Sequence, residues 1–300
     1  MTSRVDLKVG FRCNNRCHFC VQGDKRRALA AKPLAQLTAA LESGRRAGAT
    51  GLVITGGEPT LHKDVAAAAR LAAGLGYSII QVQSNGRAFC YERYCRALVD
   101  AGANQFALSL HGSSARVHDF LTDAPGSFLQ TVAGIGNLKR LGQQVLMNTV
   151  VTKPNCRDLP AIARLLAGLG ADQVQFAYPH LSGRAAQNCG WLVARKSRVA
   201  PWIKRAIDAA VAAGIPAFTE AIPHCLMRGY ERHVVERLIP DTMIFDATTV
   251  VADFTKARQN EDKAKGPRCG ACARFKDCEG PWKEYPERFG WSEFVPIPRP

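Results

Sequence analysis

The alternation of short β-type runs with longer Ala- and Leu-rich stretches constrains the fold of this chain more than any other feature of its sequence. Six such pairs follow one another up to about residue 215, the pattern expected of repeated βα units around a parallel sheet. Most helical stretches end at a glycine, as in RAGAT, GLGYS and GLGAD, where glycine can adopt the left-handed conformation that ends a helix. Six units are too few for a closed eight-stranded barrel. The sequence therefore predicts an α/β fold, either a partial (β/α)6 barrel or an open doubly wound sheet.

Strands are predicted over residues 5–11, 51–55, 78–83, 105–110, 145–151 and 173–178. Helices are predicted over residues 34–47, 63–75, 91–101, 128–141, 159–169 and 201–213. From about residue 216 the alternation stops, and the rest of the sequence is rich in cysteine, proline and charge. We therefore expect an α/β domain over residues 1–215 and a small irregular cysteine-rich domain over residues 216–300.

Composition and charge leave several classes of partner open. Hydrophobic residues make up 47% of the 300, which is ample for a sizeable core. No apolar run reaches membrane-spanning length, and the N-terminus lacks a secretion signal, so we expect a cytoplasmic protein with no membrane partner. The formal net charge of +15 indicates attraction to anions, but it fits a solvated cationic surface as well as a nucleic acid, acidic peptide or phosphorylated metabolite.

The eleven cysteines fall into two groups and a scattered remainder. In a cytosolic chain of this length, clustered cysteines more often bind metal or take part in chemistry than form disulfides. The scattered ones are expected to be small buried hydrophobic residues. The first group is Cys13, Cys17 and Cys20; the second is Cys225, Cys269, Cys272 and Cys278; the scattered four are Cys90, Cys95, Cys156 and Cys189.

The first group directly follows the first predicted strand, at the edge of the sheet where parallel-sheet enzymes place their chemistry. Three thiolates from one loop can hold a [4Fe-4S] cluster and leave one iron open to a substrate. Zinc is the structural alternative, but it requires a fourth ligand, for which His18 lies awkwardly inside the same tight loop.

With aromatic Phe19 before its last cysteine, this CxxxCxxC loop resembles that of the radical S-adenosylmethionine (SAM) superfamily, and Gly56-Gly57-Glu58-Pro59 after the second strand strengthens the resemblance. The resemblance implies a partial barrel whose [4Fe-4S] cluster binds SAM and reduces it to a 5′-deoxyadenosyl radical. It assigns Gly56, Gly57 and Glu58 to the SAM amino group, with Pro59 stiffening the turn. Paired glycines allow close backbone approach, and a carboxylate accepts charge-assisted hydrogen bonds from an ammonium.

The same resemblance suggests polar residues at later strand ends for the SAM carboxylate and ribose. The candidates are Ser84, Asn85, Ser109 and Asn148, for each of which an ordinary turn or core contact is an alternative. A lone histidine is more often structural, so His111 is left out of the catalytic set. Such an enzyme also requires a low-potential electron donor such as flavodoxin or ferredoxin.

The second cysteine group resembles the twitch and SPASM domains of radical SAM enzymes, which carry auxiliary [4Fe-4S] clusters. Four thiolates make a full set for one cluster, and no cysteine follows Cys278 to build a second one. A structural Cys₄ zinc site is the alternative. Cys189 could replace Cys225 as the remote ligand or donate a hydrogen atom, although a lone cysteine more often does neither.

The sequence therefore predicts a radical SAM enzyme that abstracts hydrogen from an anionic peptide or small molecule, in oxidation, cross-linking or epimerisation chemistry. A basic, aromatic segment over residues 184–205 could receive the anion, or be a solvated face with buried tryptophans. RNA modification is an alternative prompted by the charge and is not favoured. A non-enzymatic iron–sulfur electron carrier or scaffold is a further alternative, against which the GGEP motif argues.

Overall fold

The computed structural model describes residues 2–23 and 25–299 and contains one curved sheet of nine strands in the order β7-β6-β5-β4-β3-β2-β1-β8-β9. All neighbouring strands are parallel except the β8–β9 pair. The strands are β1 (Arg4–Lys8), β2 (Gly51–Thr55), β3 (Ile79–Ser84), β4 (Gln105–Ser109), β5 (Gln144–Val150), β6 (Gln173–Ala177), β7 (Ala217–Glu220), β8 (Thr242–Phe245) and β9 (Val250–Val251).

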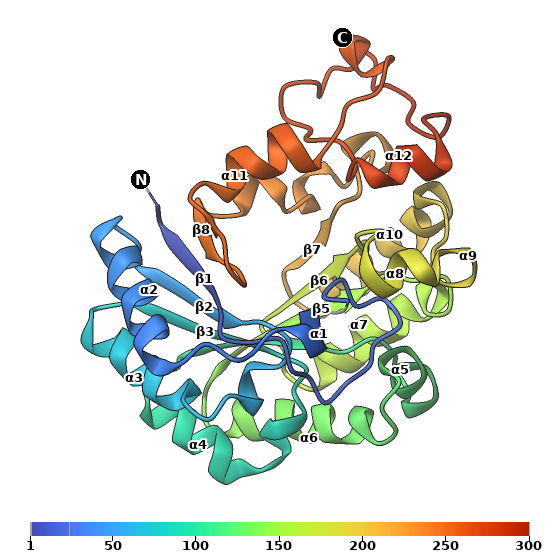
Figure 1. The fold of residues 1–300 in the computed structure, drawn as a ribbon. Helices are drawn as coiled ribbons and strands as arrows, with labels where there is room; N and C mark the ends of the chain where they lie inside the picture. Colours follow the sequence, from blue (N-terminus) through green and yellow to red (C-terminus); the bar gives the residue numbers. More distant parts are fainter. Residues whose placement is uncertain (1, 24, 300) are drawn as a thin grey trace.

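The helices that connect successive strands cover the outer face of the sheet, as Figure 1 shows for α2, α3, α4 and α6. The helices are α1 (Lys25–Ala28), α2 (Leu34–Arg46), α3 (Val65–Gly74), α4 (Glu92–Asp100), α5 (Ala115–Thr122), α6 (Ser127–Arg140), α7 (Leu159–Gly168), α8 (Gly183–Gln187), α9 (Cys189–Leu192), α10 (Lys196–Ala212), α11 (Phe254–Ala257) and α12 (Glu284–Phe289). The fold is thus the partial barrel predicted from the sequence.

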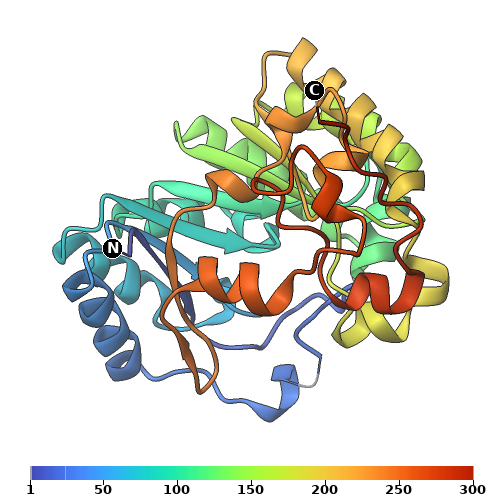
Figure 2. The same ribbon diagram turned by 90° about the horizontal axis from the view of Figure 1, so that it is seen from above.

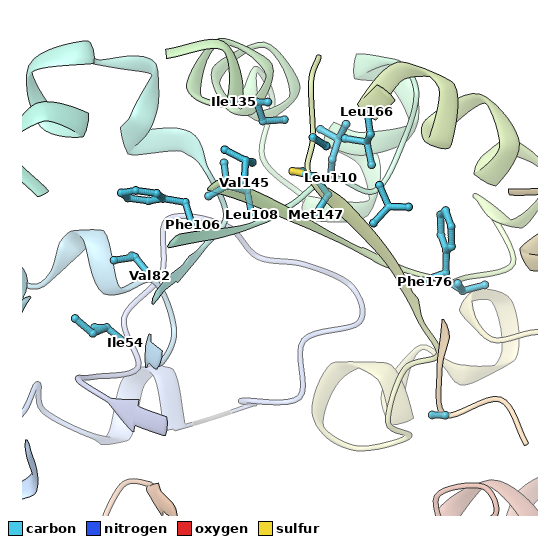
Figure 3. Packing of buried hydrophobic residues seen from close by; sticks show 14 of the residues in the cluster. Ile54, Val82, Phe106, Leu108, Leu110, Ile135, Val145, Met147, Leu166 and Phe176 are labelled. Atoms are coloured by element: carbon cyan, nitrogen blue, oxygen red, sulfur yellow. The ribbon is translucent and has the colours of Figure 1, made fainter. Parts of the chain in front are cut away.

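The core lies between the sheet and these helices because the strands alternate in burial. In β4, Phe106 and Leu108 are fully buried, whereas the residues on either side of them face the inside of the curve. Figure 3 shows such strand residues packing toward Ile135 of α6 and Leu166 of α7. One face of each strand therefore builds the core, and the other is free to line a site.

The inner face of the sheet is unusually polar. Gln105 of β4 donates to Gln144 of β5 at 2.7 Å and accepts from Gln81 of β3, which makes a row of glutamines across three strands. On β1 the carboxyl of Asp6 is buried with one oxygen unpaired, and burial raises its pKa to about 6. A barrel whose interior is polar and only partly filled provides room for a polar ligand.

The sheet continues beyond residue 215, where the βα alternation in the sequence ends. Strand β7 pairs with β6, and β8 pairs with β1, so both edges of the predicted six-stranded barrel are extended. Figure 2 shows the remaining C-terminal segment, in orange and red, lying across the structure from β8 to α12. The division into domains at residue 215 stays a prediction, but strands β7 and β8 belong to the barrel sheet.

Buried ion pairs hold this C-terminal segment in place. Arg258 makes two hydrogen bonds of 2.8 Å to the carboxylate of Glu279, and Lys263 binds Glu236 at 2.6 Å. All four side chains are less than 10% exposed, and Glu236 also accepts from the backbone N–H of Ala221. The segment after β9 is therefore anchored to the edge of the barrel at β7.

Among the described residues, no helix combines the length and apolar character needed to cross a membrane.

Candidate active site

The first cysteine group lies on a loop that leaves the end of β1 and is fixed at several points. Its backbone donates from Arg16 to Thr122 at 2.9 Å and from His18 to Leu121 at 3.0 Å. The carbonyl of Cys20 accepts from the backbone N–H of Arg184 at 2.9 Å. The loop is thus held between the end of α5 and the start of α8.

All three cysteines of this loop line one cavity of about 290 Å³ at the carboxyl ends of the strands. The sulfur of Cys13 accepts a hydrogen bond from the backbone N–H of Asn15 at 3.4 Å. Burial raises the pKa of both Cys13 and Cys17. These thiols therefore need a positively charged partner such as iron in order to ionise.

The glycine turn after β2 lies directly against the cysteine loop. The N–H of Gly57 donates to the carbonyl of Gly10 at 2.8 Å, and the N–H of Glu58 donates to Arg12 at 2.8 Å. Gly56 has a φ of 144°, and a Cβ added to Gly57 would lie 2.1 Å from the carbonyl oxygen of Phe11. Only glycines allow this contact, and both of them line the cavity.

Glu58 sits behind the cavity rather than in its wall. Its side chain is 3% exposed and does not line the cavity. One carboxylate oxygen accepts from the N–H and hydroxyl of Thr60 at 3.1 and 2.7 Å and from Ser84 at 2.8 Å, and the other accepts from the N–H of Asn85 at 2.7 Å. Burial raises the pKa of Glu58, and these hydrogen bonds oppose that effect. Pro59 is buried and begins the short helix that follows.

The polar candidates at the later strand ends separate into two sets. Ser84, Asn85 and Ser109 line the cavity, and the amide of Asn85 donates to Asn14 at 2.7 Å. Asn148 does not line the cavity: it is paired in register with Ser109, two residues before the cavity residue Val150, and its Oδ1 is buried without a partner.

His111, left out of the catalytic set on sequence grounds, lines the cavity. Its Nδ1 accepts from the N–H of Val150 at 3.1 Å, so its proton lies on Nε2. Burial holds the pKa of His111 well below its ordinary value, and the adjacent His118 lowers it further. His111 is therefore a neutral hydrogen-bond donor in the cavity wall. The sequence feature that could have identified His111 as a cavity residue is its position just after the end of a predicted strand.

The cavity wall away from the cysteines comes from β6, β7 and the C-terminal segment. It contains Glu220, which accepts from the amide of Gln175 at 2.7 Å, and Trp282, whose buried indole N–H has no partner. The ring of Trp282 lies between His180, with ring centroids 3.8 Å apart, and the ammonium of Lys263, 4.5 Å from its centroid. These residues could not be found from the sequence because they follow the last predicted unit.

The basic segment over residues 184–205 does not supply an anion site in this cavity, since none of its six cationic residues lines it. Lys196 is fully buried: its ammonium donates to Ala221 at 2.8 Å and lies 3.2 Å from the ring centroid of Tyr178. Burial lowers the pKa of Lys196 far below its ordinary value. The expectation that this segment receives an anionic substrate is therefore not supported by its position.

Comparison with known proteins is consistent with this geometry. The profile of the radical SAM superfamily matches residues 7–166, more than half of the chain, including both the cysteine loop and the glycine turn. The chain belongs to the radical SAM superfamily. Members of this family are enzymes, so the alternative of a pure electron carrier or scaffold is set aside.

This radical SAM enzyme is similar to curated proteins of several activities. An AdoMet-dependent heme synthase of Oleidesulfovibrio alaskensis is 32% identical over 136 residues, which cover 45% of this chain and 34% of that protein. A PqqA peptide cyclase of Methylobacterium nodulans is 28% identical over 192 residues, covering 63% of this chain and 49% of that protein. The chain thus spans less than half the length of either relative.

The fold is shared with solved structures as well. Streptococcus suis SuiB bound to S-adenosylmethionine superposes with a TM-score of 0.72 at 15% identity, covering 94% of this chain and 73% of that one. This likeness shows the fold alone.

The residues of this radical SAM enzyme fit the [4Fe-4S] cluster and SAM that the family implies. Three thiols on one loop would supply three cluster ligands, and the polar strand ends beside them would suit an amino acid and a ribose. Within residues 2–23 and 25–299, no three His, Cys, Asp or Glu side chains come together to hold a single metal ion.

The four cysteines of the second group line one small, largely apolar pocket of about 30 Å³ beneath Phe275, Trp291 and Phe294. Burial, together with the charges of the other three cysteines, raises the pKa of Cys225 to about 12. The structure therefore brings together four thiols that are up to 53 residues apart in the sequence. Cys189 does not line this pocket.

Proposed function

We propose that the chain reduces SAM in the 290 Å³ cavity and uses the resulting radical on a C–H bond of a peptide or small molecule. The observation that carries this proposal is the convergence of Cys13, Cys17, Cys20, Gly56 and Gly57 on that one cavity. When bound, the cluster and SAM supply the electron and the carbon radical. The chain's own part is to hold them together and to shield the radical from water.

Several residues orient SAM in this proposal. The backbone of Gly56 and Gly57 lines the cavity, where an ammonium can approach it. Ser84, Asn85 and Ser109 offer hydroxyl and amide groups along the adjoining strand ends. Neutral His111 offers an N–H. Glu58 positions Ser84 and Asn85 through its hydrogen bonds to them.

The substrate lies at the far end of the cavity, against Glu220 and Trp282. Glu220 is the one carboxylate among the described residues that line this cavity, and Arg26 is the one arginine or lysine. Arg26 is already engaged, since its guanidinium donates to the carbonyls of Cys13 and Asn15. The part of the substrate that reaches Glu220 therefore donates hydrogen bonds, as an amine, amide or hydroxyl does.

The SAM-cleavage proposal is tested by anaerobic reconstitution followed by reduction with dithionite. We expect the protein to convert SAM to 5′-deoxyadenosine and methionine in equal amounts. Cys17→Ala should abolish this conversion, whereas Cys156→Ala, at a half-buried cysteine outside both groups, should retain it. Reconstituted protein that fails to cleave SAM would contradict the proposal.

We further propose that the second cysteine group holds an auxiliary [4Fe-4S] cluster. Four thiols in an apolar pocket are a suitable ligand set for such a cluster. Two clusters require about eight irons and eight sulfides per chain, and the Cys13/Cys17/Cys20→Ala variant should bind about four of each. If the second site binds zinc stoichiometrically and does not bind iron, the cluster proposal is wrong and the site is a structural zinc site.

A further inference from the structure

A second hollow, of about 620 Å³, adjoins the SAM cavity at the cysteine loop. Cys13, Cys20 and Arg26 line both spaces, so the hollow borders the place of the cluster. The remaining lining residues are five arginines with Gly23, Asp123 and Gln187. We call this surface the arginine hollow; its arginines are Arg12, Arg16, Arg26, Arg27 and Arg184.

The positive charge of the arginine hollow is only partly balanced by the residues that the structure describes. Asp123 is the one carboxylate among the described residues that line it, and it pairs with Arg16 at 3.3 Å and Arg184 at 3.9 Å. Arg12 and Arg27 are exposed, and their side chains make no ion pair or hydrogen bond within the described part of the chain. The hollow thus presents a net positive surface to solvent.

Two of the arginines also fix the hollow to the cysteine loop. Arg26 donates to the carbonyl of Cys13 at 2.9 Å, and Arg184 donates to the carbonyl of Arg16 and contacts Nδ1 of His18 at 3.2 Å. A protein that docks here would therefore press on the backbone that carries the cluster ligands. This surface does not need to contact the substrate, because the substrate end of the cavity lies at Glu220 and Trp282.

We propose that the arginine hollow is the docking surface for a small acidic one-electron carrier protein. The inference rests on the proposed function, which requires one electron for each SAM cleaved. The reduced carrier would give up one electron, and the cluster that Cys13, Cys17 and Cys20 would hold would accept it. Charge complementarity selects an acidic carrier, and the cysteines that the hollow shares with the SAM cavity make this a short route to the cluster.

Binding is the direct test and does not depend on catalysis. Reconstituted protein is titrated with oxidised bacterial flavodoxin as the probe, at low and at high salt. We expect Arg12→Glu/Arg27→Glu to weaken binding by about tenfold or more at low salt, with a smaller difference at high salt. Arg12→Lys/Arg27→Lys, which keeps the charge, should bind within about threefold of wild type, and Arg70→Glu on the exposed surface of α3 should bind like wild type.

The same samples separate this proposal from the proposed function. SAM cleavage driven by reduced flavodoxin should fall in the double Glu variant, whereas cleavage driven by dithionite, which needs no docking surface, should continue. Unchanged flavodoxin binding in that variant, with dithionite-driven cleavage intact, would overturn the docking surface and leave the proposed function standing. If the double Glu variant loses binding to poly(U) but still binds flavodoxin, the docking proposal is also overturned, and the hollow is an RNA-binding surface instead.

Discussion

Replacing Glu58 tests whether this residue acts by organising the SAM site. Its carboxylate accepts four hydrogen bonds, two of them from the backbone N–H groups of Thr60 and Asn85. The hydroxyls of Thr60 and Ser84 can turn to other acceptors, but the two N–H groups are fixed. In Glu58→Ala, each of these two unsatisfied donors costs about 1–3 kcal/mol, so the variant should lose about 2–6 kcal/mol of stability.

Glu58→Gln gives an intermediate case. The amide keeps one oxygen acceptor but turns an NH₂ group toward one of the donors, so about half of the loss is expected. Because Ser84 and Asn85 line the cavity and are held by Glu58, SAM cleavage should fall roughly 10–100-fold in the alanine variant. Glu42→Ala, at an exposed site on α2, is the matched control and should change stability by less than about 1 kcal/mol.

The assay is anaerobic thermal unfolding at one scan rate, with SAM binding measured on the same samples. An organising role predicts that stability and SAM affinity decline together, with Glu58→Gln between wild type and Glu58→Ala. A Glu58→Ala protein that unfolds at the wild-type temperature but does not bind SAM would refute this reasoning. That result would instead support direct contact between the carboxylate and the SAM ammonium, as expected from the sequence.

Three further changes have defined outcomes. Gly57→Ala places a Cβ 2.1 Å from the carbonyl of Phe11, so it should push the cysteine loop outward and lower the iron content, whereas unchanged iron would show that the contact is not needed. Asp6→Asn should raise the unfolding temperature more at pH 7.5 than at pH 5. The pKa of Asp6 in the folded protein, about 6, exceeds the usual 3.8, so the wild-type protein loses stability as pH rises from about 4 through 6. The loss amounts to up to about 3 kcal/mol. An equal rise of the unfolding temperature at both pH values would contradict this. Cys272→Ala should make residues 216–300 more sensitive to protease because the proposed metal ligation would support the folding of that segment, and wild-type resistance to protease would contradict such support.

The barrel could be predicted from the sequence because each βα unit carries a local signal. Strand Gly51–Thr55 is found as predicted, and helix α7 begins at Leu159 as predicted and ends one residue early. The cysteine loop and glycine turn were identified by their CxxxCxxC and GGEP motifs, and each follows a predicted strand. Their meeting in one cavity follows from the common edge of parallel strands.

What the sequence did not reveal depends on distant contacts. Strand β7 has four residues and β8 has four, too short for a periodic pattern, and both are defined by pairing with β6 and β1. Trp282 reaches the cavity only because buried ion pairs hold the C-terminal segment. Asn148 was expected at the SAM site from its place in a strand, yet it lies two residues short of the cavity wall.

The central claim is that SAM binds to the cluster held by Cys13, Cys17 and Cys20. The most direct measurement is the electron paramagnetic resonance spectrum of the reduced protein, recorded with and without saturating SAM. We predict that SAM changes the signal of one cluster, and that this change is absent in Cys17→Ala, while any signal from the second cysteine group is unaffected. Identical wild-type spectra with and without SAM would contradict the account.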